Sequence, residues 1–162
     1  MKLDALQDKV VTLLTAAFPY DLVVAAPSTK VSAGETTGQN SRKKVEERME
    51  TALATRGLCW AVSPMLQGRQ VNGAGGRSAS IRAYVKALLR TNPEVNGNGT
   101  TGAGTEPVAA IRTAVAAVLA HAETGNRKFA LSEDEDCLEL VEDAKDPGLL
   151  CWRLTFTYVV QI

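Results

Sequence analysis

The final segment of the chain, residues 150–162, constrains the fold more than any other. One set of alternating positions carries large apolar side chains: Leu150, Trp152, Leu154, Phe156, Tyr158, Val160 and Ile162. The intervening positions are mostly polar, and a period of two is the pattern of a β-strand with one buried face. A strand of this length and aromatic content is expected at the centre of an antiparallel sheet, with its apolar face against helices.

Three segments predict helices. Residues 3–17 place apolar side chains three and four positions apart until Pro19 stops the pattern. Residues 41–56 show the same spacing, with Gly57 where a left-handed C-terminal cap is wanted. A third helix begins after Thr105, an N-cap residue, with Pro107 in its first turn and His121 near its end.

Residues 79–91 fit both periods. Ile81, Tyr84, Val85, Leu88 and Leu89 form a helical stripe, yet the odd-numbered residues from 81 to 89 are all apolar, as in a strand. Residues 65–72 precede them as a second possible strand, and the glycine-rich residues 73–76 are suited to a turn. We therefore predict an antiparallel hairpin.

Shorter strands are predicted at residues 22–26, 58–63, 129–131 and 137–142. The order of elements indicates an α+β domain: a mixed or mainly antiparallel sheet packed by two or three helices. At 162 residues the chain has the length of one domain, residues 1–162, with a core that needs no disulfide or metal. Residues 28–40 and 92–104 are expected to be mobile loops or interaction arms.

The charge is balanced overall but divided along the chain. Eighteen basic residues face eighteen acidic ones, which argues against a dedicated nucleic-acid binder. Residues 42–90 hold ten basic and three acidic residues, whereas residues 91–162 hold five basic and eleven acidic. The two halves either attract neighbouring copies of the chain or neutralise each other within one subunit. No stretch has the length and apolarity of a membrane helix, and the opening residues do not read as a signal peptide.

Motifs for cofactors and metals are weak. Residues 97–102 read G-x-G-x-x-G, but Pro93 separates them from the preceding strand and no second βαβ unit follows, so a flexible loop is favoured over a dinucleotide site. Residues 73–78 lack the lysine of a phosphate loop. The acidic run Glu133, Asp134, Glu135 and Asp136 lacks the spacing of a calcium loop, and a solvated turn is favoured. We predict no cofactor or metal site.

An enzyme is the less favoured interpretation. His121 is the single histidine, and a catalytic dyad requires it to meet Cys59, Cys137 or a serine. A partly exposed histidine near a helix C-terminus is the more ordinary explanation. The three cysteines form no CxxC pair and are expected to be buried thiols in a reducing compartment.

One strand face carries a row of cations. Arg82, Lys86 and Arg90 share it with Tyr84, a pattern that fits an outward sheet face or a subunit contact better than a nucleic-acid platform. We hypothesise that these three residues meet Glu133, Asp134, Glu135 and Asp136 of a neighbouring subunit.

The chain resembles tail-terminator and related minor tail or neck proteins of long-tailed bacteriophages. The resemblance covers nearly the whole chain and rests on the opening amphipathic helix together with the segments ATRGLCWAVSPML, LLRTNPEVN, EPVAAIRTAVAAVLAHA and DPGLLCWRLTFTYVVQI. It depends on the order and texture of the elements and includes no catalytic signature.

The resemblance implies a structural virion protein that assembles, typically as a hexameric ring, on the last ring of tail-tube protein. Such a ring stops polymerisation of the tube, offers a surface to the head connector, and lets DNA pass without sequence-specific recognition. Assembly would take place in the host cytoplasm. Two alternatives are a neighbouring neck or head-completion adaptor ring and, from another class, a small Cys/His enzyme.

Overall fold

A computed structural model describes residues 1–26, 36–63, 67–72, 80–96, 107–123, 127–133, 137–142 and 150–161. A 3-10 turn, η1 (Leu3–Ala5), opens the chain. The helices are α1 (Leu6–Ala17), α2 (Thr36–Thr55), α3 (Pro93–Asn96) and α4 (Pro107–Leu119). The strands are β1 (Leu22–Ala25), β2 (Leu58–Val62), β3 (Gln67–Asn72), β4 (Ser80–Thr91), β5 (Ala122–Glu123), β6 (Arg127–Lys128), β7 (Ala130–Leu131), β8 (Leu138–Glu142) and β9 (Leu150–Gln161).

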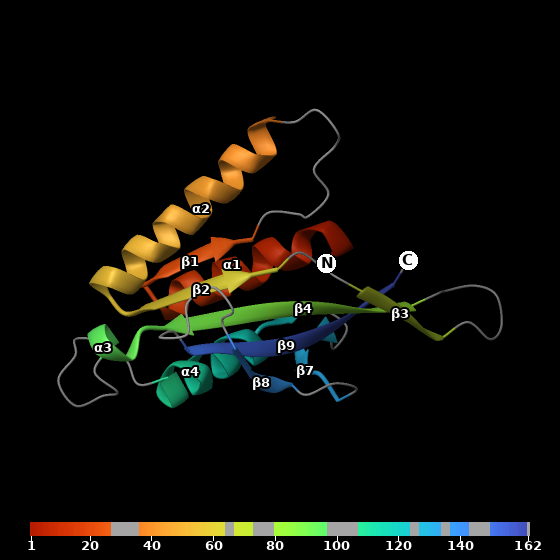
Figure 1. Ribbon diagram of the computed structural model, residues 1–162. Helices are drawn as coiled ribbons and strands as arrows, with labels where there is room; N and C mark the ends of the chain where they lie inside the picture. Colours follow the sequence, from red (N-terminus) through yellow and green to blue (C-terminus); the bar gives the residue numbers. More distant parts are fainter. Residues whose placement is uncertain are drawn as a thin grey trace.

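Within these residues, one seven-stranded sheet organises the molecule. Its order is β1-β2-β4-β9-β7, with β3 also paired to β4 and β8 also paired to β9. The β1–β2 pair is parallel and all the others are antiparallel. Figure 1 shows β1 at the upper edge of the sheet and β7 and β8 at the lower edge. The α+β class with a mainly antiparallel sheet is therefore confirmed.

The longest pairing joins β4 to β9. It runs without a break from Ser80↔Gln161 to Thr91↔Leu150. Because side chains alternate across a strand, this register puts the odd-numbered residues of β4 and the even-numbered residues of β9 on the same face. Residues 80–91 thus form a strand, as the predicted hairpin requires, and β9 is a central strand as its alternation indicates. The turn predicted at residues 73–76 lies outside the described residues.

The face that β4 and β9 share packs against α1 and α4. The two helices contribute buried side chains at helical spacing: Leu6, Val10, Leu14, Ala110, Ala114 and Val118. The sheet contributes Trp60, Ala83, Val85, Leu89, Leu154, Phe156 and Tyr158. The small alanines of α4 let the helix approach closely, and the Phe18 and Trp60 rings meet with centroids 5.4 Å apart. This face holds the larger of the two cores.

The opposite face is covered in part by α2. Val24, Met49, Leu53, Cys59 and Ala61 form a second buried cluster between α2 and the strands β1 and β2. The helix ends as predicted, with Gly57 at a φ of 74° and its N–H donating to the Ala52 carbonyl at 3.1 Å. A residue with a Cβ is disfavoured in that conformation. Figure 1 shows α2 leaning away from the sheet towards its N-terminal end.

Two predicted loops are shorter than the sequence indicated. The second helix begins at Thr36, so residues 36–40 of the predicted loop 28–40 are helical. These residues are weak helix formers, but extending an existing helix costs much less free energy than nucleating one. The lysines and glutamates that follow favour the helix from which residues 36–40 extend. Residues 93–96 of the predicted loop 92–104 form α3, in which the Glu94 N–H donates to the Asn92 side chain at 3.1 Å. Residues 27–35 and 97–106 lie outside the described residues.

Two further features were not predicted. The short strands β5 and β6 pair with each other in a separate two-stranded sheet after α4. The parallel pairing of β1 with β2 follows from the position of α2, which connects them. No helix in the described part of the chain is long and apolar enough to cross a membrane.

The two faces of β9 predict a contrast in stability. Phe156 is fully buried, whereas Val159 is 40% exposed on the other face of the same strand. Phe156→Ala is expected to lower the free energy of unfolding by about 3 to 5 kcal/mol because it empties the core. Val159→Ala is expected to change it by roughly 0.5 kcal/mol or less. Chemical denaturation of both variants measures the difference, and equal losses would contradict the assigned register.

Candidate assembly surfaces

The predicted row of cations lies on the sheet face opposite α1 and α4. Arg82, Lys86 and Arg90 are half-buried there. In the register, Arg90 pairs with Cys59 on one side and Cys151 on the other, and both thiols are buried. Tyr84, between Arg82 and Lys86, is also buried. The row is therefore set into the sheet rather than displayed as a flat exposed surface.

The predicted acidic partner is described in part. Glu133 is exposed directly after β7, and Asp134, Glu135 and Asp136 lie outside the described residues. Arg82 and Glu133 of the same subunit line one hollow of about 130 Å³, which also includes Lys128 and Thr157. Opposite charges of one subunit therefore line the same hollow. The pairing of the whole row with an acidic run across an interface stays a prediction.

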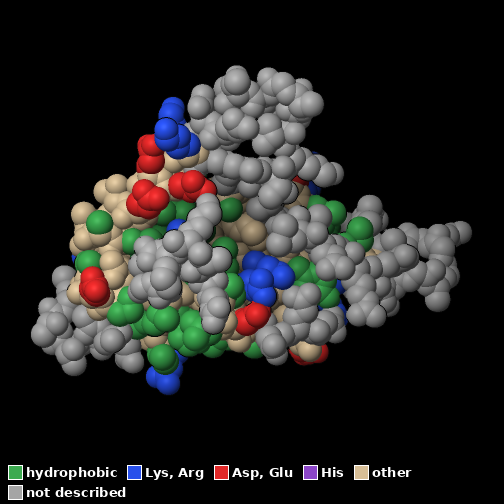
Figure 2. Space-filling view, viewed as in Figure 1, with side chains coloured by type: hydrophobic (Ala, Val, Ile, Leu, Met, Phe, Trp, Pro, Cys, Tyr) green, Lys and Arg blue, Asp and Glu red, His purple; other side chains and the backbone are tan. Residues whose placement is uncertain are grey.

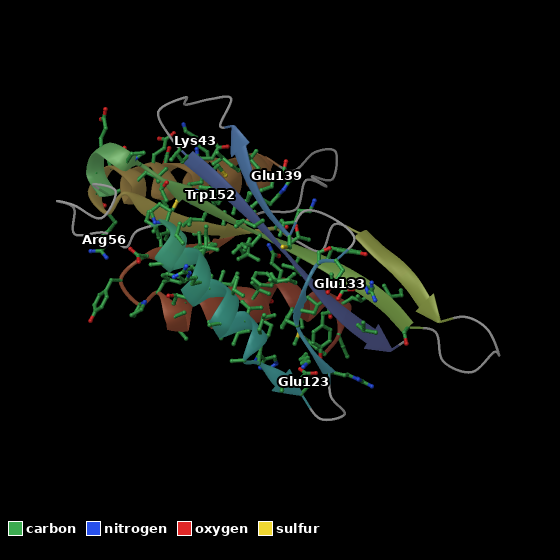
Figure 3. All side chains as sticks on the ribbon, turned by 90° about the horizontal axis from the view of Figure 1, so that it is seen from below. Lys43, Arg56, Glu123, Glu133, Glu139 and Trp152 are labelled. Carbon is green, nitrogen blue, oxygen red and sulfur yellow. The ribbon has the colours of Figure 1, made fainter. Side chains whose placement is uncertain are left out.

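The charge division of the sequence follows the order of the elements along the chain. Residues 42–90, the basic part, include α2, β2, β3 and β4. Residues 91–162, the acidic part, include α4 and all strands from β5 to β9. Within the described strands, β3 and β4 carry four cations and no carboxylate, whereas β5 to β9 carry three carboxylates and three cations. In the view of Figure 3, Arg56 lies at one side of the molecule and Glu133 lies well away from it.

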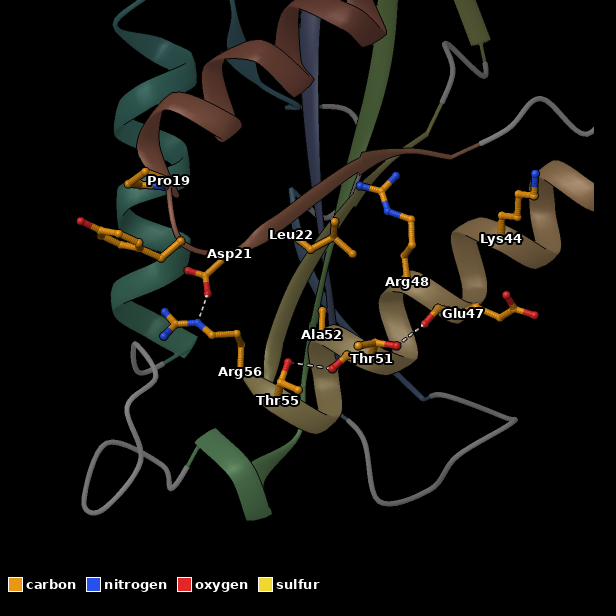
Figure 4. Close-up of a pocket in the computed structure, with 11 residues that line it drawn as sticks. Pro19, Asp21, Leu22, Lys44, Glu47, Arg48, Thr51, Ala52, Thr55 and Arg56 are labelled. Atoms are coloured by element: carbon orange, nitrogen blue, oxygen red, sulfur yellow. Dashed lines mark hydrogen bonds and ion pairs between the residues drawn. The ribbon is translucent and has the colours of Figure 1, made fainter.

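A groove runs along the β1 edge. It lies between α2 and the turn at Pro19 and Tyr20, with a volume of about 670 Å³. Leu22 and Ala52 are among its apolar lining residues, and Lys44, Glu47 and Arg48 lie along α2. The Arg56 Nε donates to Asp21 Oδ1 at 3.2 Å and holds the turn against the helix. Figure 4 shows this bond and shows Arg48 reaching across the groove towards β1.

Two features of the groove favour binding a partner. The ring of Tyr20 stands 82% exposed beside it, which is unusual for a large aromatic side chain. Lys44 and Arg48 make no ion pair with any described residue, so their charge is available to a partner.

The opposite edge carries exposed leucines. Leu138 and Leu140 of β8 are 42% and 52% exposed, and Leu150 of β9 is 37% exposed. Leu138 and Leu140 pair in the register with Leu154 and Trp152, so they continue the apolar face of β9 beyond the core. Figure 2 shows hydrophobic side chains gathered over α4 and the adjoining ends of β8 and β9. An exposed apolar edge strand is a typical site of association.

His121 belongs to an ionic cluster at the other end of α4. Its Nε2 lies 3.8 Å from Glu123 Oε1, and its ring lies near Phe129. The other carboxylate oxygen of Glu123 accepts hydrogen bonds from the Met1 amine at 2.9 Å and the Tyr158 hydroxyl at 2.7 Å. These donors lower the pKa of Glu123 to about 2, and burial together with the bond to Glu123 raises the pKa of Tyr158 to about 12.

The structure does not bring His121 to the buried cysteines. His121 contacts Phe129 in the core beneath α1 and α4, whereas Cys59 belongs to the cluster beneath α2, on the opposite face of the sheet. Burial raises the pKa of Cys59 to about 12, against the opposing effect of Arg90. A thiol with that pKa is protonated at neutral pH and is a poor nucleophile.

The remaining motifs carry no site in the described residues. The segments 73–78 and 97–102 lie outside them. Among the residues that are described, no three His, Cys, Asp or Glu side chains gather where they could hold a metal ion.

Comparisons with known proteins add little. No protein-family model matches the sequence, and no curated protein matches it. Three solved structures of Akkermansia muciniphila proteins show a distant likeness with TM-scores of 0.33, 0.32 and 0.31 and sequence identities of 9%, 8% and 8%. Each match covers 97% of this chain and 76%, 85% and 82% of the other chains, of which the second is described as a core domain and the third as lacking its transmembrane region. A likeness this distant assigns no function.

Sequence reasoning missed both edge surfaces. Leu138 and Leu140 were assigned to a strand, but nothing in their spacing showed that α4 stops short of them. Tyr20 follows Pro19 in a polar turn, and an aromatic residue in such a turn is the one available signal. The groove depends on the distance between α2 and that turn, which periodicity does not encode.

The cluster around Glu123 predicts a pH dependence. Because the pKa of Glu123 is lower in the folded chain than its ordinary value of 4.5, its stabilising effect is complete above that value and is lost as the pH falls towards 2. Glu123→Gln should therefore be less stable than the wild type at pH 7, with the gap narrowing between about pH 4.5 and pH 2. Urea denaturation across that range measures the gap.

Glu94→Gln, at an exposed carboxylate on α3, serves as the control and should leave the pH profile unchanged. A gap between wild type and Glu123→Gln that stays constant down to pH 2 would contradict the assigned network.

Proposed function

We propose that this protein is a ring-forming virion subunit that ends a phage tail tube at its head-proximal side and joins it to the head connector. One observation supports this most: the two edges of a single sheet carry unlike surfaces, a groove lined by Lys44 and Arg48 at β1 and exposed leucines at β8. A ring of identical subunits needs two different, complementary surfaces on each subunit, placed so that the contact repeats and closes. A two-fold symmetric dimer, in which the same surface of both subunits meets, would need only one such surface.

The segments that carry the resemblance stated for the sequence lie together in the fold. The opening helix, the long strand β4, the helix α4 and the closing strand β9 are the parts of the chain that carry it, and they form the central layer pair of the fold. The partners proposed are other copies of the chain, the tail-tube protein and the head connector or adaptor.

Deletion of the gene from its phage tests the function. Loss of a terminator should give overlong tails of variable length, because nothing stops polymerisation of the tube. Negative-stain electron microscopy of the lysate measures the length distribution, and a plasmid copy of the wild-type gene should restore a single length. Full heads beside separate tails of normal length would contradict the terminator and indicate a neck adaptor instead.

The row on β4 gives a second prediction. If Arg82, Lys86 and Arg90 bind the acidic run of a neighbour, reversing all three charges should weaken ring assembly most at low salt, where screening is least. Reversing Glu133, Asp134, Glu135 and Asp136 in the same chain should restore it. Sedimentation velocity at low and high salt measures assembly, and a triple variant that assembles like the wild type at both would remove this row from the interface.

A further inference from the structure

We infer that the groove at the β1 edge is the receiving surface for the β8 edge of a second copy of the chain. This inference rests on the proposed ring function and names the two surfaces that form its repeating contact. The surfaces involved are the groove, lined by Tyr20, Leu22, Lys44, Arg48 and Ala52 together with Glu47 and the Asp21–Arg56 ion pair, and the β8 edge, formed by Leu138, Leu140 and the flanking Glu133.

The positions of the two surfaces fit a head-to-tail contact. β1 and β8 lie at opposite edges of the same sheet, as Figure 1 shows, so one subunit can offer its groove and its β8 edge to two different neighbours. Neither surface has to bind the same surface of another subunit. Such a contact is heterologous, and a heterologous contact generates a ring when its rotation closes.

The chemistry of the two surfaces is complementary. The apolar lining and the exposed Tyr20 ring offer contacts for Leu138 and Leu140, which would lose most of their exposure to water. The described acidic residues at this edge are Glu133, Glu139 and Glu142, of which Glu139 pairs with Arg153. Glu133 is exposed and makes no ion pair with any described residue. Lys44 and Arg48 at the groove are also exposed, and neither makes an ion pair with a described residue.

Two variants separate the two surfaces. Lys44→Glu with Arg48→Glu disables the groove, and Leu138→Thr with Leu140→Thr disables the edge while keeping residues that favour strands. Each variant alone should sediment as a 17.2 kDa monomer where the wild type assembles. Mixed together, they should form a 1:1 heterodimer and nothing larger, since the mixture has one intact groove meeting one intact edge.

The control is Lys43→Glu. Lys43 is exposed on α2 next to Lys44 but does not line the groove, so this variant should assemble like the wild type. Thermal unfolding of every variant checks that the fold is kept. Rings formed by either double variant, or a mixture that stays monomeric, would overturn the inferred contact; overlong tails after gene deletion would still support the terminator function.

Photo-crosslinking tests the contact even where assembly needs the tube as a template. A benzoylphenylalanine placed at Tyr20 in heavy-isotope chains, mixed with light wild-type chains and tail-tube protein, should crosslink to light peptides that contain residues 137–142. Crosslinks to the light groove itself, or no crosslink between chains, would overturn the inference.

Discussion

The pairing of β4 with β9 is the interaction on which the rest of the structure depends. Twelve residues of each strand pair without a break, from Ser80↔Gln161 to Thr91↔Leu150. This register sends one set of side chains into the core beneath α1 and α4 and the other set to the opposite face. It also leaves each strand one free side, which β2 and β3 fill on β4 and β7 and β8 fill on β9.

The pairing also fixes the two edges of the sheet. β2 and β1 continue it on the β4 side, and β7 and β8 end it on the β9 side. The groove beside α2 and the leucines of β8 lie at opposite edges of the sheet because of the order of its strands. A neutral protein acquires two unlike surfaces, which is what a closed ring of one subunit needs.

The strands and helices were predictable where a pattern was strong. The alternation in residues 150–162 was enough to identify β9, and Gly57 marked the end of α2 because a left-handed residue is wanted there. The prediction of a loop at residues 36–40 was wrong. Their weak helix propensity counts for little, because they extend a helix that the following residues already form. The choice of strand over helix was correct for residues 80–91, where β3 pairs with β4 from Ser80 to Tyr84.

The candidate site was less predictable than the fold. Arg82, Lys86 and Arg90 were correctly placed on one strand face, but their depth in the sheet depends on what packs around Tyr84 and the two cysteines. The exposed fractions of the Tyr20, Leu138 and Leu140 side chains depend on how far the neighbouring helices extend over them. A sequence pattern shows on which face of a strand or helix a residue lies, but not how much of that residue the neighbouring elements cover.

Hydrogen exchange of the free and assembled chain tests the central claim most directly. The head-to-tail account predicts slower exchange on assembly in two separate places, the segment from Pro19 to Leu22 with the adjoining part of α2, and the residues 137–142 of β8. Amides of β4, already paired on both sides with β2, β3 and β9, should change little. Protection at one of the two edges alone, or at neither, would contradict the account.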